Sequence, residues 1–212
     1  MKSPSFATAL VAAAAATLLA VAPAAAREPG PYEVKELPAQ SKLPKAVKVK
    51  GNQVLQIWTW QEYDLIKTGY AVFSQTETMK GGRVTGRKIF VQLFTGKGDA
   101  QKELRMITDG VPACEFDVIA GFIAGSVSVT DEDFDGVNEL TFAYDVDCVS
   151  DVSPVTRKLL VLEGKDKHAL RGHSQVNPGD GNVGGDYKAD GFKKAPSIKA
   201  LAEQRWKDLL GT

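Results

Sequence analysis

The sequence predicts a mainly β domain that ends in a single helix. Apolar and polar residues alternate with a period of two in several short segments, and turn-forming glycine, proline and aspartate residues separate these segments. Helical spacing of apolar residues is clear only near the C-terminus, over residues 197–210. Strands that follow one another without helices between them favour antiparallel pairing. We therefore expect antiparallel meander sheets with this helix packed on them.

The N-terminal residues 1–26 predict a secretory signal peptide. Lys2 precedes an apolar run, and the small residues Ala24 and Ala26 stand directly before Arg27, as at a signal-peptidase cleavage site. The apolar run is shorter than the ~20 residues of a comfortable membrane span. We therefore expect an exported mature chain, periplasmic or extracellular, that has no membrane span.

Residues 27–50 predict a proline-rich linker, and residues 51–212 predict a single β-rich domain. The linker has four prolines and scattered charges with little apolar periodicity, which is typical of an extended tether. The remaining length suits one domain with its own core. The chain has 26 basic and 26 acidic residues and no basic stripe, so its composition argues against nucleic-acid binding.

Strands are expected wherever the alternation is clear, beginning with residues 54–60. Residues 101–107 instead indicate a helical turn. The glycine-rich segment 179–191 is expected to be a flexible loop, with its aspartates as an alternative second cation site. The other expected strands cover residues 69–77, 87–94, 116–120, 126–129, 140–144, 158–164 and 168–172.

An acidic loop between two of these strands is the strongest candidate for a binding site. With Asp131 as position 1 of the loop, positions 1, 3 and 5 offer side-chain oxygens, position 6 is glycine and position 9 has a carboxylate. This pattern suits a hard cation with six to eight oxygen ligands. An EF-hand would also need glutamate at position 12, where this chain has Phe142. The loop is similar to the strand–loop–strand calcium loops of the integrin or FG-GAP kind. Its predicted ligands are Asp131, Asp133, Asp135, the Val137 carbonyl and Glu139.

The alternative for this loop is an acidic turn that needs no ion. Aspartate is common in turns because its side chain bonds to its own backbone. Four converging carboxylates without a cation would repel one another, however. This repulsion favours a bound cation, and calcium in particular.

The two cysteines, Cys114 and Cys148, predict a disulfide because the chain is expected to be exported. The bridge would stabilise the fold by about 3–4 kcal/mol on the chain-entropy model. It would also brace the acidic loop, which lies between the two cysteines in sequence. The alternative is two buried, reduced cysteines that pack as small apolar residues.

Three tryptophans are candidates for packing or for sugar binding. Trp206 lies on the apolar face of the C-terminal helix, for which Ser197 is the expected N-cap. Trp58 and Trp60 share one face of their strand. We expect them to pack against the helix, and the alternative is an exposed platform that stacks on glycans.

The combination of the acidic loop with residues 148–154 and 158–172 resembles a family of exported bacterial proteins that is labelled surface polysaccharide biosynthesis proteins. The resemblance extends over about residues 51–210 and includes CEFD at residues 114–117 and the closing helix. It implies an association with envelope polysaccharide, and it implies no catalytic residues. Phe134 stands where a small polar residue is usual, at a loop position whose side chain points away from the ion.

Catalytic motifs are absent from the sequence. The chain has two histidines, His168 and His173, and no G-x-S-x-G, HExxH or CxxC pattern. We therefore expect an exported, calcium-stabilised, non-catalytic β domain that is an envelope or surface-polysaccharide binding module. The alternative is a glycan-active hydrolase or transferase, which would need two carboxylates outside the acidic loop beside aromatic walls. The sequence does not indicate an oligomeric state.

Overall fold

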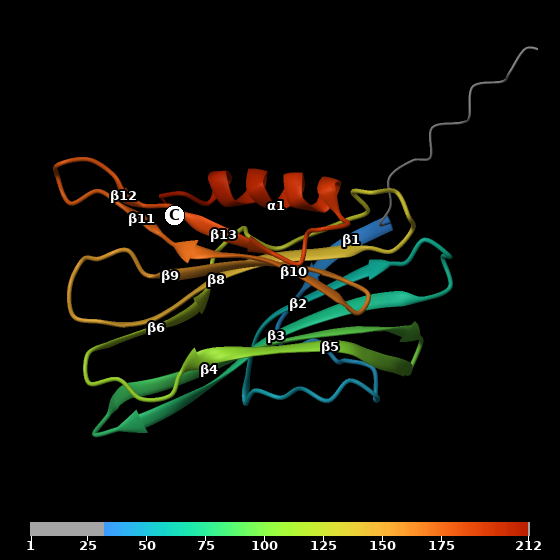
Figure 1. The fold of residues 1–212 in the computed structure, drawn as a ribbon. Coiled ribbons are helices and arrows are strands. Elements are labelled where there is room, and N and C mark those ends of the chain that lie inside the picture. The colour runs from blue at the N-terminus through green and yellow to red at the C-terminus, as the bar shows by residue number, and fades with distance from the viewer. Residues whose placement is uncertain (1–31, 212) are drawn as a thin grey trace, which may run out of the picture.

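The computed structural model describes residues 32–211 and arranges them as two stacked antiparallel sheets with one helix (Figure 1). The predicted mainly β fold with a C-terminal helix is confirmed. The predicted signal peptide, residues 1–26, lies outside the described residues. Within the part of the chain that the structure describes, no helix is long and apolar enough to cross a membrane.

The first sheet is a five-stranded meander in which each strand pairs with its neighbours in the sequence. Its first strand lies inside the segment expected to be a linker, because Lys35 and Glu36 pair with Thr59 and Trp58 at the edge of the sheet. Residues 101–107, expected as a helical turn, belong to its last strand. The five strands are β1 (Tyr32–Leu37), β2 (Gln53–Gln61), β3 (Thr68–Lys80), β4 (Arg83–Lys97) and β5 (Ala100–Val111).

The second sheet has the strand order β13-β10-β9-β8-β6, and a short strand β7 also pairs with β8. A separate ribbon of β11 (Gln175–Val176) and β12 (Val183–Gly184) lies beside it. The glycine-rich segment expected to be a loop therefore contains β12 and β13. The strands of the second sheet are β6 (Asp117–Phe122), β7 (Ser128–Thr130), β8 (Glu139–Val149), β9 (Thr156–Glu163), β10 (Asp166–His173) and β13 (Tyr187–Asp190).

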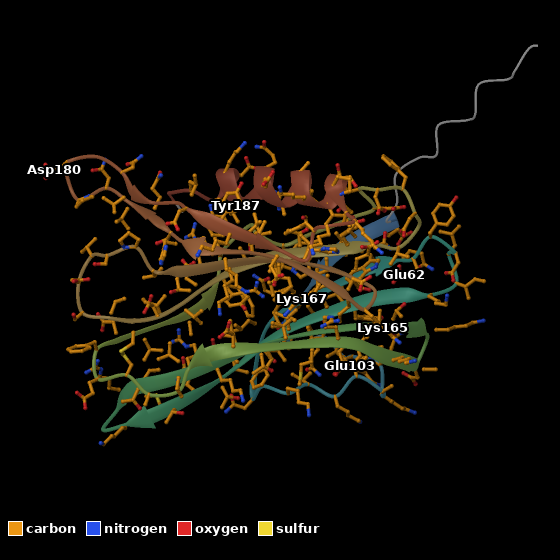
Figure 2. All side chains as sticks on the ribbon, viewed as in Figure 1. Glu62, Glu103, Lys165, Lys167, Asp180 and Tyr187 are labelled. Atoms are coloured by element: carbon orange, nitrogen blue, oxygen red, sulfur yellow. A yellow bond between two sulfur atoms is a disulfide. The ribbon has the colours of Figure 1, made fainter. Side chains whose placement is uncertain are left out.

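The main core lies between the two sheets, where side chains from both inner faces fill the space (Figure 2). Phe73 of the first sheet makes edge-to-face contacts with Phe122 and Phe142 of the second. Trp60 is 2% exposed in this core, and Trp58 is partly buried against it. The two tryptophans thus pack against the opposite sheet and not against the helix, and their burial argues against an exposed glycan platform.

Each sheet has a cover on its outer face. Residues 38–50 cross the first sheet, where Val47 packs on Val72 and Phe94. The helix α1 (Pro196–Asp208) covers the second sheet. Its N-cap is Ala195, which makes no side-chain capping bond, so the predicted Ser197 cap is wrong. Pro196 occupies the first helical position, where its fixed φ favours the helix start.

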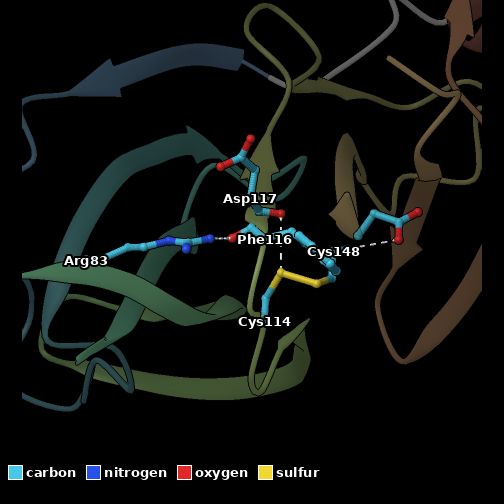
Figure 3. Close-up of a disulfide and its surroundings, with 6 residues drawn as sticks. Arg83, Cys114, Phe116, Asp117 and Cys148 are labelled. Carbon is cyan, nitrogen blue, oxygen red and sulfur yellow. Dashed lines mark hydrogen bonds between the residues drawn. A yellow bond between two sulfur atoms is a disulfide. The ribbon is translucent and has the colours of Figure 1, made fainter. Parts of the chain in front are cut away.

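The predicted disulfide between Cys114 and Cys148 is present and joins the segment before β6 to the end of β8 (Figure 3). The Cα atoms are 5.7 Å apart. The acidic loop precedes Glu139 at the opposite end of β8, about 30 Å away at ~3.3 Å per strand residue. The bridge therefore fastens β6 to β8 and does not brace the acidic loop directly, contrary to the expectation from sequence order.

Candidate metal centre

The acidic loop covers one end of the outer face of the second sheet, where strand pairing aligns two rows of residues that are polar except for Val161. Alternation along the strands places both rows on the face that α1 covers further along. One row crosses the sheet as Thr130, Glu139, Glu163 and Asp166, and the next as Ser128, Thr141, Val161 and His168. The sheet thus presents a polar floor beneath the loop.

The predicted acidic ligands divide into two overlapping groups of carboxylates. In each group one oxygen from each residue lies within 4.8 Å of the others. The first group contains Asp131, Asp133 and Glu139, and the second contains Asp133, Asp135 and Glu163. Glu163 was missed by sequence reasoning, because it arrives from β9 as the direct cross-strand partner of Glu139. Only knowledge of the β8–β9 register would have revealed it.

The loop itself is folded by short-range hydrogen bonds. The Gly136 N–H donates to Asp131 Oδ1 at 3.2 Å, and the Val137 N–H donates to Asp135 Oδ1 at 2.7 Å. Gly136 has φ of 85°, which glycine adopts without strain. Such bonds occur in turns with or without an ion. The loop backbone therefore does not distinguish the calcium site from an acidic turn, and the Val137 carbonyl ligand stays a prediction.

The buried carboxylate of Glu139 is the feature of the site that a simple acidic turn does not require. Its side chain is 0% exposed. Its Oε2 accepts hydrogen bonds from Thr130 Oγ1 at 2.7 Å and from the Glu132 N–H at 2.9 Å. Its Oε1 is buried and has no hydrogen-bond partner among the described residues. An isolated buried carboxylate oxygen of this kind is costly, and a missing ion or water is an ordinary explanation for it.

The electrostatics of Glu139 agree with its geometry. The pKa of Glu139 is raised to about 7, chiefly by burial and also by the nearby Asp133 and Asp131 charges, although hydrogen bonds from Glu132 and Thr130 oppose the shift. Glu163 stands directly opposite on the same face, and like charges in that position destabilise a sheet. A proton or a cation would relieve this cost.

His168 lies beside the same carboxylates. It is 6% exposed, and its Nδ1 is 2.9 Å from the Gly191 carbonyl oxygen. A carbonyl only accepts, so Nδ1 carries the hydrogen of this contact. Nε2 is 3.6 Å from Glu163 Oε2 and has no hydrogen-bond partner among the described residues. Burial, followed by Asp133 and Asp135, raises the pKa of Glu163.

A cavity of about 530 Å³ opens beside these residues, next to the start of α1. Its lining combines acidic and basic residues: Asp133, Glu163, Asp166, His168, Lys167, Lys193 and Lys194. The lining contains no tryptophan, tyrosine or phenylalanine. The cavity therefore gives an ion a route from solvent and offers no aromatic surface for stacking a sugar.

The far side of the loop is tied to the first sheet. Asn138 Nδ2 donates to Glu62 Oε2, and Thr95 Oγ1 donates to Glu62 Oε1 at 3.1 Å. Glu62 follows β2 directly, and Figure 2 labels its position. Asn138 thus holds the loop against the first sheet, while Glu139 of β8 and Glu163 of β9 contact the loop from the second sheet.

Comparisons with known proteins do not assign this arrangement to a family. No family model matches the chain, and neither a curated protein nor a solved structure matches it significantly. The resemblance to surface polysaccharide biosynthesis proteins therefore stays a prediction.

Proposed function

We propose that this protein is an exported β-sandwich that binds one calcium ion at its acidic loop and serves as a non-catalytic binding module of the cell envelope. The observation that carries the calcium proposal is Glu139, whose buried Oε1 lacks a partner among the described residues beside Asp131 and Asp133. A cation there neutralises carboxylates that the fold otherwise holds together against their repulsion.

The number and kind of ligands favour calcium. Calcium takes six to eight oxygen ligands at 2.3–2.6 Å and accepts irregular geometry, whereas magnesium demands a tight octahedron and loses its waters reluctantly. Glu163 takes the place of the position-12 glutamate of an EF-hand, although it comes from a neighbouring strand. The proposed ligands are Asp131, Asp133, Asp135, the Val137 carbonyl, Glu139 and Glu163.

The envelope role rests on different support. The predicted signal peptide and the disulfide both suit an exported chain. The resemblance to surface polysaccharide biosynthesis proteins suggests polysaccharide as the partner. The enzyme alternative has less support, because the cavity at the loop is lined by Asp133, Glu163 and Asp166, which adjoin the proposed ion, and by no aromatic wall.

Melting curves in chelator, calcium and magnesium test the calcium site. Extracellular calcium modules have dissociation constants on the order of 0.1–1 mM, so about 2 mM calcium should stabilise the fold by about 0.6–1.8 kcal/mol. For a domain of this length the melting temperature should rise by roughly 1–7 °C. Magnesium should restore less. Asp133→Asn with Asp135→Asn should abolish the calcium response without lowering the stability of the chelated protein.

The matched control removes two exposed carboxylates elsewhere, by Asp151→Asn with Glu115→Gln. This variant should keep the full calcium response. An unmodified protein that melts identically in all three solutions would leave the acidic turn as the correct interpretation. The envelope role is tested separately by a glycan array of the mature protein with and without calcium, and the absence of binding in both would contradict that role alone.

A further inference from the structure

The inner surface of the sandwich changes character at its open side, where β5 approaches β9 and β10. The core between the sheets is apolar, but at this edge there is a cleft of about 260 Å³ whose lining includes several charged side chains. Figure 2 shows one of them, Lys167, between the two sheets. Four basic residues line the cleft: Arg105 from β5, Lys158 from β9, and Lys167 and Arg171 from β10.

Only part of this positive charge is neutralised. Among the described residues that line the cleft, Asp109 is the one acid. Its Oδ2 accepts hydrogen bonds from Lys158 Nζ at 2.6 Å and from the Tyr144 hydroxyl at 2.9 Å. The charge of Lys158 is therefore neutralised by Asp109. Arg171 pairs outside the cleft with the exposed Asp190 at 2.9 Å. The chain as a whole has a formal net charge of zero, so this excess is local.

Arg105 and Lys167 have no ion-pair partner among the described residues. The guanidinium of Arg105 donates to the backbone carbonyl of Lys165, which carries no charge, and its Nε is buried without a hydrogen-bond partner. Lys167 lies across the cleft on β10, where it pairs in register with Leu162. Two unpaired positive groups therefore face one space from opposite sheets.

The strand register adds a cost that an anion would relieve. Lys158 and Arg171 are direct cross-strand partners on the inner face, and like charges in that position destabilise a sheet. A folded chain has little reason to gather four cations at the edge of a core unless something negative occupies the space.

We infer that this cleft binds an anion, with Arg105 and Lys167 as the recognising residues. Arginine offers a planar fork that matches an oxyanion, and lysine adds a point charge. The volume is below the roughly 300–1,000 Å³ of sites for drug-sized ligands. It therefore suits one phosphate, sulfate or carboxylate group with a small body. The cleft lies on the opposite face of the second sheet from the acidic loop, but Lys167 lines both this cleft and the cavity beside that loop, so binding is to be measured without calcium.

Titration with inorganic phosphate, followed by nuclear magnetic resonance in chelator and at constant ionic strength, tests the inference. We expect saturable binding with a dissociation constant on the order of 1 mM and shifts at residues of the cleft. Arg105→Gln with Lys167→Gln should weaken binding about tenfold or more, because each removes a charge-assisted contact. The matched control, Lys97→Gln with Lys102→Gln, removes two exposed lysines of the neighbouring β4–β5 hairpin and should change affinity by less than about twofold.

The single variant Lys167→Gln guards against a folding defect, because Lys167 is exposed and its loss leaves the core intact. Phosphate binding that is absent in the unmodified protein, or equal in the double variant and the unmodified protein, would overturn the inference. Glucose 6-phosphate, glucuronate and uncharged glucose then distinguish the source of the anion. If glucose 6-phosphate or glucuronate binds more tightly than inorganic phosphate, the site recognises that charged sugar. If neither binds more tightly than inorganic phosphate, the site recognises the free anion. Glucose that binds as tightly as inorganic phosphate would overturn the role of charge.

Discussion

The outer face of the second sheet has two halves that share strands but differ in how they are closed. Under α1, the strands present Ala143, Leu159 and Leu170, which pack against Ile198 and Trp206 of the helix. Under the acidic loop, the same strands present the buried Glu139 and His168 and the partly buried Glu163. Successive residues on one face of a strand are only about 7 Å apart, so the change is abrupt.

The first half is stabilised by apolar packing within the chain, whereas the stability of the second half depends on the ions and the pH of the solution. The apolar half excludes water on its own. The polar half contains Glu139 Oε1, Thr141 Oγ1 and His168 Nε2, which are buried without hydrogen-bond partners among the described residues. We therefore expect the helix-covered half to respond to changes in packing, and the loop-covered half to respond to ions and pH.

The largest effect should come from Trp206→Ala in the apolar half. Trp206 is 1% exposed, and its Nε1–H donates to the Gly185 carbonyl at 2.9 Å. Truncating a core tryptophan should lower the free energy of unfolding by about 3–5 kcal/mol. Denaturant unfolding should give the same loss in calcium and in chelator. The neighbouring exposed substitution Lys207→Ala serves as the control, and a loss that depends on calcium would show that the two halves are coupled.

An intermediate effect should come from pH in the polar half. Burial raises the pKa of Glu139 to about 7 from its ordinary value of 4.5, so the folded state holds a proton that the unfolded state loses. In chelator, the free energy of unfolding should therefore rise by about 1–2 kcal/mol as the pH falls from 8 to 5.5. Calcium competes with this proton and should stabilise less at pH 5.5 than at pH 8.

Glu139→Gln is the control for the pH experiment, because the neutral amide has the same shape and does not titrate. Melting of this variant in chelator should vary less between pH 8 and 5.5. If the unmodified, chelated protein were instead less stable at pH 5.5, Glu139 would not be the group that governs stability in this range.

The smallest effect should come from Glu163→Gln, which tests whether the ion links the loop to β9. Removing one charged ligand should weaken calcium binding about tenfold, equivalent to about 1.4 kcal/mol, since affinity follows the number of charged ligands. Calorimetric titration would measure this change, with the exposed Glu115→Gln as the control. Unchanged affinity would restrict the ion to the group of Asp131, Asp133 and Glu139.

The parts of the fold that are local in sequence could be predicted. The period of two identified most strands, and the period of 3.6 identified α1, because burial on one face imposes these periods directly. The spacing of Asp131, Asp133 and Asp135 predicts a cation loop from one short segment. The structure brings their carboxylates together in two overlapping groups, and the bound ion stays a prediction.

Features that depend on strand pairing could not be predicted in the same way. Glu163 and His168 reach the loop through the register of β8, β9 and β10, which no single segment encodes. Residues 101–107 form part of β5 because β4 offers them an edge, and such pairing overrides local preference. The prediction that the disulfide braces the acidic loop was wrong for a related reason, because sequence order does not show that the length of β8 separates them.

Strand β8 is fastened at both ends by bonds of different chemistry. Cys148 near its last residue is joined to Cys114, and Glu139 at its first residue faces the proposed ion. The first fastening forms only where thiols are oxidised, and the second only where free calcium is abundant. A chain among reducing agents and little calcium would lack both fastenings. An interior strand of the second sheet would thus be secured at both ends only in an oxidising, calcium-rich compartment, which is the kind of compartment that the proposed export implies.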